Sequence, residues 1–209
     1  MTAKKKFGTK RVLGFDASTK TIGVSVIDYN PHWVTARPSV ELVHSEFYKP
    51  PTKGTIFQRL STVRNQIEEY LHDWEPDDVA IEDIVLFMSG LSTAKTITSL
   101  AIFNRMVGLT VFDKMRKGPT LLSVMAVRHA LKLDKVLPKK EEMPDLVSHH
   151  LQIPFPWIVN KKGAIASESY DVADSIAVGL AFILKSAEKP ARASVKKKKA
   201  RVRRVDGDK

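Results

Sequence analysis

Two short apolar segments separated by a four-residue turn, within residues 11–28, constrain the fold of this chain more than any other feature. The first segment is VLGF, and the second is IGVSVI at residues 22–27. The turn ASTK between them predicts a β-hairpin. Asp16 ends the first strand, so the hairpin carries a carboxylate at its end. A carboxylate buried alone is costly and needs water, a basic partner or a metal ion.

Two glycines flank this turn and bear on what can approach it. Gly14 and Gly23 lack a Cβ atom, which lets another backbone segment or a ligand come close. Taken singly, Asp16 is equally consistent with an ordinary turn residue, because Asp favours turns for backbone reasons. Whether Asp16 belongs to a functional site or to an ordinary turn therefore depends on partner residues elsewhere in the chain.

The segments that follow predict one α/β domain. Val40–Tyr48 alternates in polarity and predicts a third strand, which completes an antiparallel meander. Apolar residues at helical spacing predict a helix over Thr55–Trp74. The remaining expected elements are strands at Val79–Ile81 and Thr120–Val124, a long helix capped by Ser92 and reaching about Lys117, two helical pieces within Met125–Leu151 separated by Pro138, and a late helix containing Asp171. The expected fold is a mixed five-stranded sheet, a meander of three strands plus parallel strands, flanked by helices.

Composition excludes several classes of protein. The chain has no cysteine, so disulfides, thiolate nucleophiles and zinc-thiolate sites are excluded. It contains no apolar run of 18 or more residues, and no apolar segment follows the lysines at its N-terminus. We therefore expect a soluble, intracellular protein without a membrane partner.

Positive charge is concentrated at the C-terminus. Residues 188–209 contain ten Lys or Arg against three acids, a net charge of +7 that leaves +4 for the rest of the +11 total. We predict a basic N-terminal extension over residues 1–10, a folded domain over 11–187 and a disordered basic tail over 188–209. Such a tail binds polyanions without reading sequence. A solubility tail or localisation signal is the alternative.

Further acids follow a strand and begin a helix. Glu82 and Asp83 come directly after the apolar run VAI, and neighbouring strand residues point to opposite faces. We assign Glu82 to the same site as Asp16 because the strand ends there. Asp171 and Asp174 lie three residues apart on one side of a helix, where the helix N-terminus favours anions.

Oxygen-only ligands of this kind suit Mg²⁺ or Mn²⁺. Two such ions about 4 Å apart can activate a water and stabilise the leaving oxygen of a phosphodiester. Asp16, Glu82, Asp171 and Asp174 are therefore the predicted metal-binding and catalytic residues, with two ions in the site.

Two other segments have features that fit nucleic acid. The apolar stretch at 84–94 contains Phe87 and reads as a loop showing hydrophobic side chains, with ordinary core as the alternative. Within residues 125–151 the basic side chains outnumber the acidic ones and suit phosphates, with a solvated surface as the alternative. His149 and His150 are adjacent, which suits no shared face, so we interpret them as structural.

The order of Asp16, Glu82 and the Asp171/Asp174 pair resembles the RNase H-like nuclease superfamily and, within it, the RuvC-type Holliday junction resolvases. FDASTKTIG is similar to their first motif, with matching places at Asp16, Thr19, Lys20 and Gly23 and with Ala17-Ser18 where the bacterial form has Pro-Gly. AIED is similar to the second motif, YDVADSIAVGLAF to the last, and TSLAIFNRMVGL to the central helix.

The resemblance covers residues 11–186 and implies a divalent-metal endonuclease that, as a symmetric dimer, nicks two strands of a four-way DNA junction. It also implies an aromatic wedge, for which Phe87 is the nearest candidate, and a lysine near the site, for which Lys140 is the candidate. The expected DNA contacts are Lys20, Phe87, Arg128, Lys139, Lys140, Lys196, Lys197, Lys198, Lys199, Arg201, Arg203 and Arg204.

Three alternatives remain open at the level of sequence, and the identity of any helicase partner is open as well. The same fold could act on other branched DNA, flaps, RNA/DNA hybrids or transposon ends. An actin-like ATPase or sugar kinase shares a hairpin with Asp, small residues and Gly, but that fold needs two such lobes and usually about twice this length. A non-catalytic DNA-binding module would require all four acids to be vestigial.

Overall fold

A computed structural model describes residues 4–32, 38–84 and 93–205 of this chain, with only the backbone described for 187–205. Its centre is a five-stranded sheet of order β3-β2-β1-β4-β5. The strands are β1 (Lys10–Ala17), β2 (Ile22–Tyr29), β3 (Val40–Tyr48), β4 (Asp78–Asp83) and β5 (Thr120–Ser123). β1, β2 and β3 pair antiparallel, whereas β4 lies parallel to both β1 and β5. The predicted mixed sheet, a meander plus parallel strands, is confirmed.

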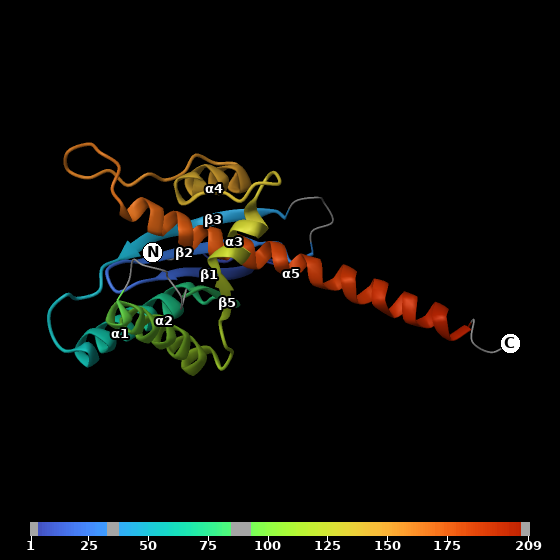
Figure 1. The fold of residues 1–209 in the computed structure, drawn as a ribbon, viewed down its shortest axis with the longest axis horizontal. Coiled ribbons are helices and arrows are strands. Elements are labelled where there is room, and N and C mark those ends of the chain that lie inside the picture. The colour runs from blue at the N-terminus through green and yellow to red at the C-terminus, as the bar shows by residue number, and fades with distance from the viewer. Residues whose placement is uncertain (1–3, 33–37, 85–92, 206–209) are drawn as a thin grey trace.

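Helices cover both faces of the sheet (Figure 1). One face carries α1 (Ile56–Trp74) and α2 (Ala94–Met115). The other carries α3 (Val124–Leu131), α4 (Met143–Leu151), which follows the 3-10 turn η1 (Lys140–Glu142), and α5 (Glu168–Val205). Strand residues alternate between the two cores, so that Leu13 and Phe15 face α1 and α2 while Val12 faces α5.

The crossing of α5 over the hairpin depends on two glycines. A Cβ atom added to Gly14 would lie 2.3 Å from the backbone oxygen of Ser175, and one added to Gly23 would lie 2.1 Å from that of Asp171. The hydroxyl of Ser25 donates a hydrogen bond of 2.9 Å to the same Ser175 oxygen. The expectation that Gly14 and Gly23 permit close approach is confirmed, and what approaches is the backbone of α5.

Two predicted boundaries are wrong by one residue. The N-cap of α2 is Thr93, not Ser92, because the Thr93 hydroxyl accepts a hydrogen bond of 3.2 Å from the amide of Thr96. β5 ends at Ser123, whose hydroxyl accepts from the amide of Ala126 at 3.2 Å, so Val124 begins α3 and does not extend the strand. Each hydroxyl satisfies a helix N-terminal amide that has no partner within the helix.

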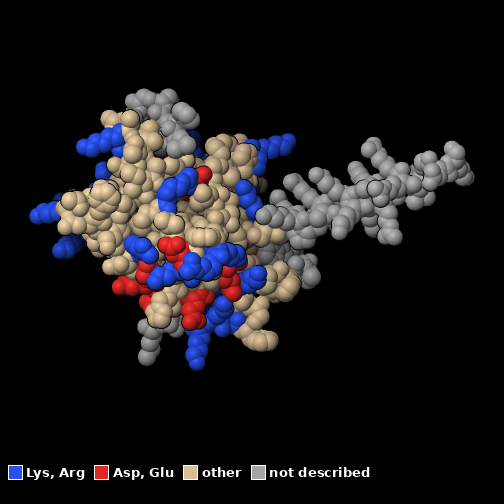
Figure 2. All heavy atoms as spheres, turned by 90° about the horizontal axis from the view of Figure 1, so that it is seen from below, with Lys and Arg blue, Asp and Glu red and all other residues tan. Residues whose placement is uncertain are grey.

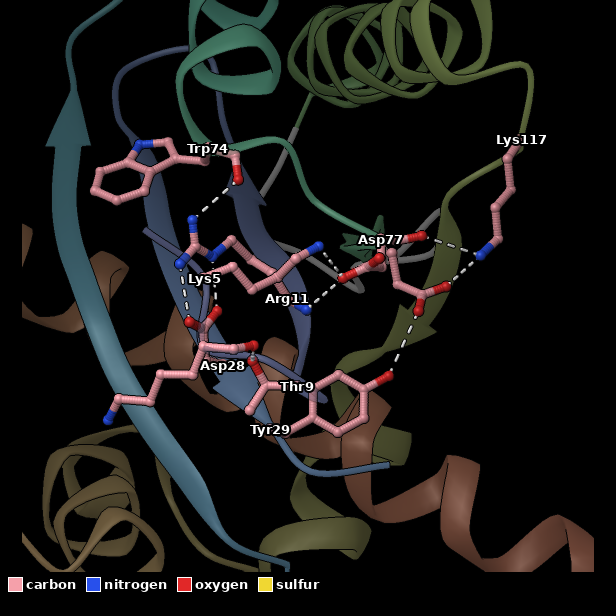
Figure 3. Close-up of polar contacts among 10 residues, drawn as sticks. Lys5, Thr9, Arg11, Asp28, Tyr29, Trp74, Asp77 and Lys117 are labelled. Atoms are coloured by element: carbon pink, nitrogen blue, oxygen red, sulfur yellow. Dashed lines mark hydrogen bonds and ion pairs between the residues drawn. The ribbon is translucent and has the colours of Figure 1, made fainter. Parts of the chain in front are cut away.

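A buried ion pair connects β1 and β2 at the end of the strands opposite Asp16 (Figure 3). The Arg11 guanidinium donates to both carboxylate oxygens of Asp28, at 2.6 and 2.8 Å, and to the backbone oxygen of Trp74 at 3.1 Å. The backbone amide of Arg11 donates to Asp77, and Lys5 pairs with the same carboxylate. These contacts join β1, β2 and the chain that enters β4.

The last helix extends to Val205, into the segment for which the sequence predicts a disordered basic arm. No side chain beyond Ser186 is described, and the disorder of this arm in solution stays a prediction. Within the described parts of the chain, none of the helices has the length and apolar character needed to cross a bilayer.

Candidate active site

Parallel pairing of β1 and β4 places two of the predicted acids side by side. Phe15 is the register partner of Ile81, and the next residues along the two strands are Asp16 and Glu82. Both lie on the sheet face that α5 covers, since Val12 and Ala80, an even number of residues earlier in each strand, belong to the core beneath α5. Asp83 points to the other face, where it pairs with Arg105 of α2 at 2.8 Å. The preference for Glu82 over Asp83 agrees with this geometry, although the predicted strand Val79–Ile81 is too short, since β4 runs from Asp78 to Asp83 and does not end at Glu82.

The remaining two acids arrive on the first turns of α5. Asp16 is the register partner of Gly23, and the backbone of Asp171 rests directly on Gly23. Asp174 is one turn further along the same helix. Burial raises the pKa of Asp16 most, and repulsion from Glu82, Asp174 and Asp171 raises it further. All four carboxyl groups therefore lie close enough to interact electrostatically. The structure therefore brings together all four acids selected from the sequence.

Lys140, the first residue of η1, reaches into this group. The Nζ atom of Lys140 lies 3.1 Å from Oδ2 of Asp174 and 3.9 Å from Oδ1 of Asp171. The turn that carries it is closed by the amide of Lys139, which donates to Glu142 at 2.6 Å. Half of the Lys140 side chain is exposed (49%), whereas Asp174 is 14% exposed. The Lys140 ammonium, which remains accessible to solvent, thus lies against a mostly buried carboxylate.

Burial and like charge shift the acids of this site in one direction. Burial, followed by repulsion from Asp174, raises the pKa of Glu82 to about 7, although Lys140 and Arg128 oppose the rise. Burial also raises the pKa of Asp16 well above its usual range, and it raises the pKa of Asp171 and Asp174. The raised pKa values mean that the negative charge of the four carboxylates is only partly compensated by Lys140 and Arg128, which favours binding of a further cation.

The donor chemistry fits a hard divalent cation. The four carboxylates offer oxygen ligands alone, the set that Mg²⁺ and Mn²⁺ prefer. As the side chains lie, however, no group of three or more such donors among the described residues is arranged to hold a metal ion. The ammonium of Lys140 instead provides the positive charge against Asp171 and Asp174.

A small pocket of about 140 Å³ opens beside the acids. Asp16, Glu82 and Ser18 contribute its polar wall. Its apolar wall comes from Ile97 and Leu100 of α2 and from Val124, where α3 begins. The pocket therefore lies at the C-terminal ends of the parallel strands β1 and β4, where Asp16 and Glu82 line it.

The predicted DNA contacts divide into three groups. Arg128 lies close enough to the acids to lower the pKa of both Glu82 and Asp174. Lys20, in the β1–β2 turn, and Lys139 are exposed near the site. Phe87 lies outside the described residues, as do the side chains of Lys196, Lys197, Lys198, Lys199, Arg201, Arg203 and Arg204.

Sequence reasoning missed two residues that hold the acids. A side-chain hydrogen bond from Thr21 lowers the pKa of Asp171. The Nδ2 atom of Asn104, buried on α2, donates to the backbone oxygen of Glu82 at 2.8 Å. Thr21 lies within the first motif, FDASTKTIG, directly after Lys20, and could have been suspected from that position. Asn104 lies in an apolar helix about 20 residues after Glu82, and nothing in the sequence links the two.

Comparison with known proteins bears on the fold. No protein-family model matches the sequence. RuvC of Thermus thermophilus, solved in complex with a Holliday junction substrate, superposes with a TM-score of 0.62 at 19% identity, over 86% of this chain and 96% of that one. The chain has the RuvC fold. The yeast mitochondrial Holliday junction resolvase Ydc2 has the same fold, with a TM-score of 0.57 at 18% identity over 87% of this chain and 80% of that one.

The RuvC fold accounts for the arrangement that assembles the acids. It combines the meander, the parallel strand β4 and the crossing helix α5, which together place Asp16, Glu82 and the Asp171/Asp174 pair at one end of the sheet. The predicted RNase H-like fold class is confirmed. At 19% identity the likeness concerns the fold, and the roles of individual side chains rest on their own geometry.

Proposed function

We propose that this protein is a divalent-metal-dependent endonuclease that resolves four-way DNA junctions by paired nicks. The observation that carries the proposal is the convergence of Asp16, Glu82, Asp171 and Asp174 at one end of a RuvC-fold sheet, with Lys140 against two of them. Solved proteins of this fold include RuvC in complex with a Holliday junction substrate. The chain spans almost the whole length of that relative.

The four acids would hold Mg²⁺ or Mn²⁺, in the two-ion arrangement that suits phosphodiester hydrolysis. A bound divalent ion supplies Lewis acidity and lowers the pKa of a coordinated water. In the metal-free protein burial and repulsion raise the pKa of Glu82 to about 7, so binding of a divalent ion at neutral pH would displace a proton from this carboxyl group. Lys140, half exposed beside Asp174, can offer its ammonium to a phosphate oxygen on the open side of the site.

Charge supports a nucleic-acid substrate. Arg128 lies close enough to the acids to act on Glu82. Lys20 is exposed in the turn after β1, Lys139 is exposed next to Lys140, and the tail adds a net +7. These cations would bind the DNA backbone through release of counterions, so affinity should fall steeply with salt. The tail would then act as a sequence-independent arm that holds the junction while the acids cut it.

Paired nicks require two active sites, and α2 offers a surface for a second copy. Ile102, Leu109 and Phe112 follow one stripe of α2 and are 41%, 59% and 49% exposed. Figure 2 shows the side of the molecule that carries α1 and α2, where a band of acidic and basic side chains borders uncharged surface. An isologous contact through this stripe would produce the symmetric dimer that the function needs.

The test is cleavage of a panel of DNAs by the wild-type protein and by Asp174→Asn with Mg²⁺. We expect symmetrical nicks in a four-way junction by the wild type, and binding without cleavage by the variant. Asp145→Asn, which removes an exposed acid of α4, is the matched control and should cut normally. Equal cleavage of junctions, flaps and RNA/DNA hybrids would favour a general branched-DNA nuclease, and undiminished cleavage by Asp174→Asn would refute the proposal.

A further inference from the structure

The segment between α4 and α5 forms a small hairpin. The amide of Asn160 donates to the oxygen of Ala164 at 2.8 Å, and the amide of Ala166 donates to the oxygen of Ile158, also at 2.8 Å. Val159 and Ile165 form an antiparallel bridge between the two arms. The hairpin is the orange loop that projects at the N-terminal end of α5 in Figure 1. It is therefore a defined structure and not an open loop.

The tip of this hairpin is folded by its own polar groups. The Asn160 side chain accepts hydrogen bonds from the amides of Lys162 and Ala164, at 2.9 and 3.2 Å, and the Gly163 amide returns to the Asn160 oxygen at 2.9 Å. An Asx turn of this kind fixes the backbone at the tip. Lys161 and Lys162 are consequently presented together, both exposed, at a fixed place.

The surface of the hairpin is apolar along its arms and basic at its tip. Trp157, Val159 and Ile165 are 41%, 62% and 51% exposed. Residues 146–167 include no acid. The first acid after the hairpin, Glu168, forms an ion pair with Lys49, and no ion pair among the described residues involves Lys161 or Lys162. Exposed apolar arms with an unopposed pair of lysines are more typical of a contact surface than of a solvated loop.

Rigid contacts link the hairpin to the acids. The buried Ser169 hydroxyl bonds to both the amide and the oxygen of Ile158, at 3.1 and 3.2 Å. The Trp157 ring packs edge-on against Tyr170, with centroids 6.3 Å apart, and Tyr170 immediately precedes Asp171. The position of the hairpin is thus fixed relative to the first turn of α5, which carries Asp171 and Asp174.

We infer that the hairpin 155–166 is a second DNA-contacting element, in which Lys161 and Lys162 bind backbone phosphates of the duplex arm next to the cleaved strand. The inference rests on the proposed function and extends it to a surface outside the acid cluster. Trp157 and the apolar arms lie against the sugars of the same strand. A polyanion fits this surface because its tip is cationic and lacks acids, whereas a second copy of the chain would have to supply acids opposite Lys161 and Lys162.

Binding of a fluorescent four-way junction in EDTA, measured by anisotropy across a salt series, tests the inference in the full chain. Lys161→Ala/Lys162→Ala should weaken binding about tenfold near 0.15 M salt and make the slope of log K against log salt less negative by about 1 to 2. Lys161→Arg/Lys162→Arg should keep the wild-type slope. Lys4→Ala/Lys10→Ala is the matched control, because it removes the same charge near the start of β1, at the end of the strand away from Asp16. It should leave the slope near the wild-type value.

The outcomes separate this inference from the proposed function. If the wild type binds and cuts the junction but the hairpin variant behaves as the control does, the inference alone is wrong. If the wild type neither binds nor cuts a junction, the proposed function fails and the inference with it. If Val159→Ser/Ile165→Ser lowers the sedimenting mass without changing DNA binding, the hairpin is an interface between copies, and the inference is overturned.

Discussion

The Nζ atom of Lys140 lies 3.1 Å from Oδ2 of Asp174. Asp174 is the more buried of the two ion-pair partners of Lys140, and the attraction of the acids raises the pKa of the lysine although its own burial opposes the rise. The ammonium therefore partly compensates the negative charge of the site. Because the side chain is also half exposed, it can exchange this contact for one with a phosphate.

Replacing this lysine with methionine keeps most of the side-chain volume and removes the charge. We expect Lys140→Met to lower the single-turnover cleavage rate by about 10²-fold, the usual effect of losing one electrostatic contact to a reacting group. Lys135→Met, an exposed lysine of the preceding loop, is the control and should change the rate less than about twofold. A Lys140→Met rate equal to that of the control would show that the ammonium does not act in the reaction.

Gly23 offers a test of how the acids are assembled. A Cβ atom there would lie 2.1 Å from the backbone oxygen of Asp171, so Gly23→Ala must push α5 away from the hairpin. We expect a loss of about 2–3 kcal/mol in the free energy of unfolding, as in other overpacked sites, and loss of most cleavage. Urea unfolding and junction cleavage measure the two effects. Gly118→Ala meets no atom within 4 Å and serves as control; equal effects of the two variants would contradict this explanation.

The four acids could be predicted from sequence because each sits where local pattern is informative. Asp16 and Glu82 follow apolar strand runs, and strand alternation predicts that Glu82 and Asp83 face opposite sides of the sheet, so only one of them can join Asp16. The Asp171/Asp174 spacing places both on one helical face. The sheet register and the close approach of α5 to Gly14 and Gly23 bring these segments together. The two glycines are visible in the sequence and agree with a close approach, but they do not identify α5 as the segment that approaches.

Other features of the site depend on contacts between distant segments, which single-sequence patterns do not reveal. Asn104 reaches the backbone oxygen of Glu82, and a backbone oxygen has no side-chain signature. The hairpin 155–166 contains only one bridge, Val159 to Ile165, so it lacks the longer alternation that predicts a strand. The buried Arg11–Asp28 pair links the two ends of the hairpin, and no local sequence pattern predicts this contact.

The raised pKa of Glu82 predicts a pH dependence of stability without divalent ions. Between its ordinary value of 4.5 and the folded value of about 7, the folded protein keeps a proton that the unfolded chain releases. Stability therefore falls as pH rises through this window. Glu82→Gln should be more stable than the wild type by about 1–3 kcal/mol at pH 8 and nearly equal to it at pH 5, by urea unfolding in EDTA. Glu69→Gln, an exposed acid of α1, should show no such difference between the two pH values.

Divalent ions should reverse this destabilisation. At a free Mg²⁺ concentration about 100 times the dissociation constant, binding to the folded state alone stabilises it by about 2.7 kcal/mol. We expect Mg²⁺ to raise the thermal midpoint of the wild type at pH 8, and to raise that of Asp16→Asn much less. Asp145→Asn should respond as the wild type does. An equal response of all three proteins would mean that Mg²⁺ binds elsewhere.

Arg11 and Asp28 provide the last prediction, which concerns stability away from the acids. Their side chains are 4% and 5% exposed, so Arg11→Met leaves the Asp28 carboxylate buried without its guanidinium partner. We expect a loss of about 3–5 kcal/mol in the free energy of unfolding by urea. Arg64→Met breaks the surface ion pairs of Arg64 with Glu68 and Asp113 and should cost about 1 kcal/mol or less. Arg11→Met/Asp28→Leu should recover most of the loss, because the cost comes from the unpaired buried charge; a double variant as unstable as Arg11→Met would assign the cost to packing instead.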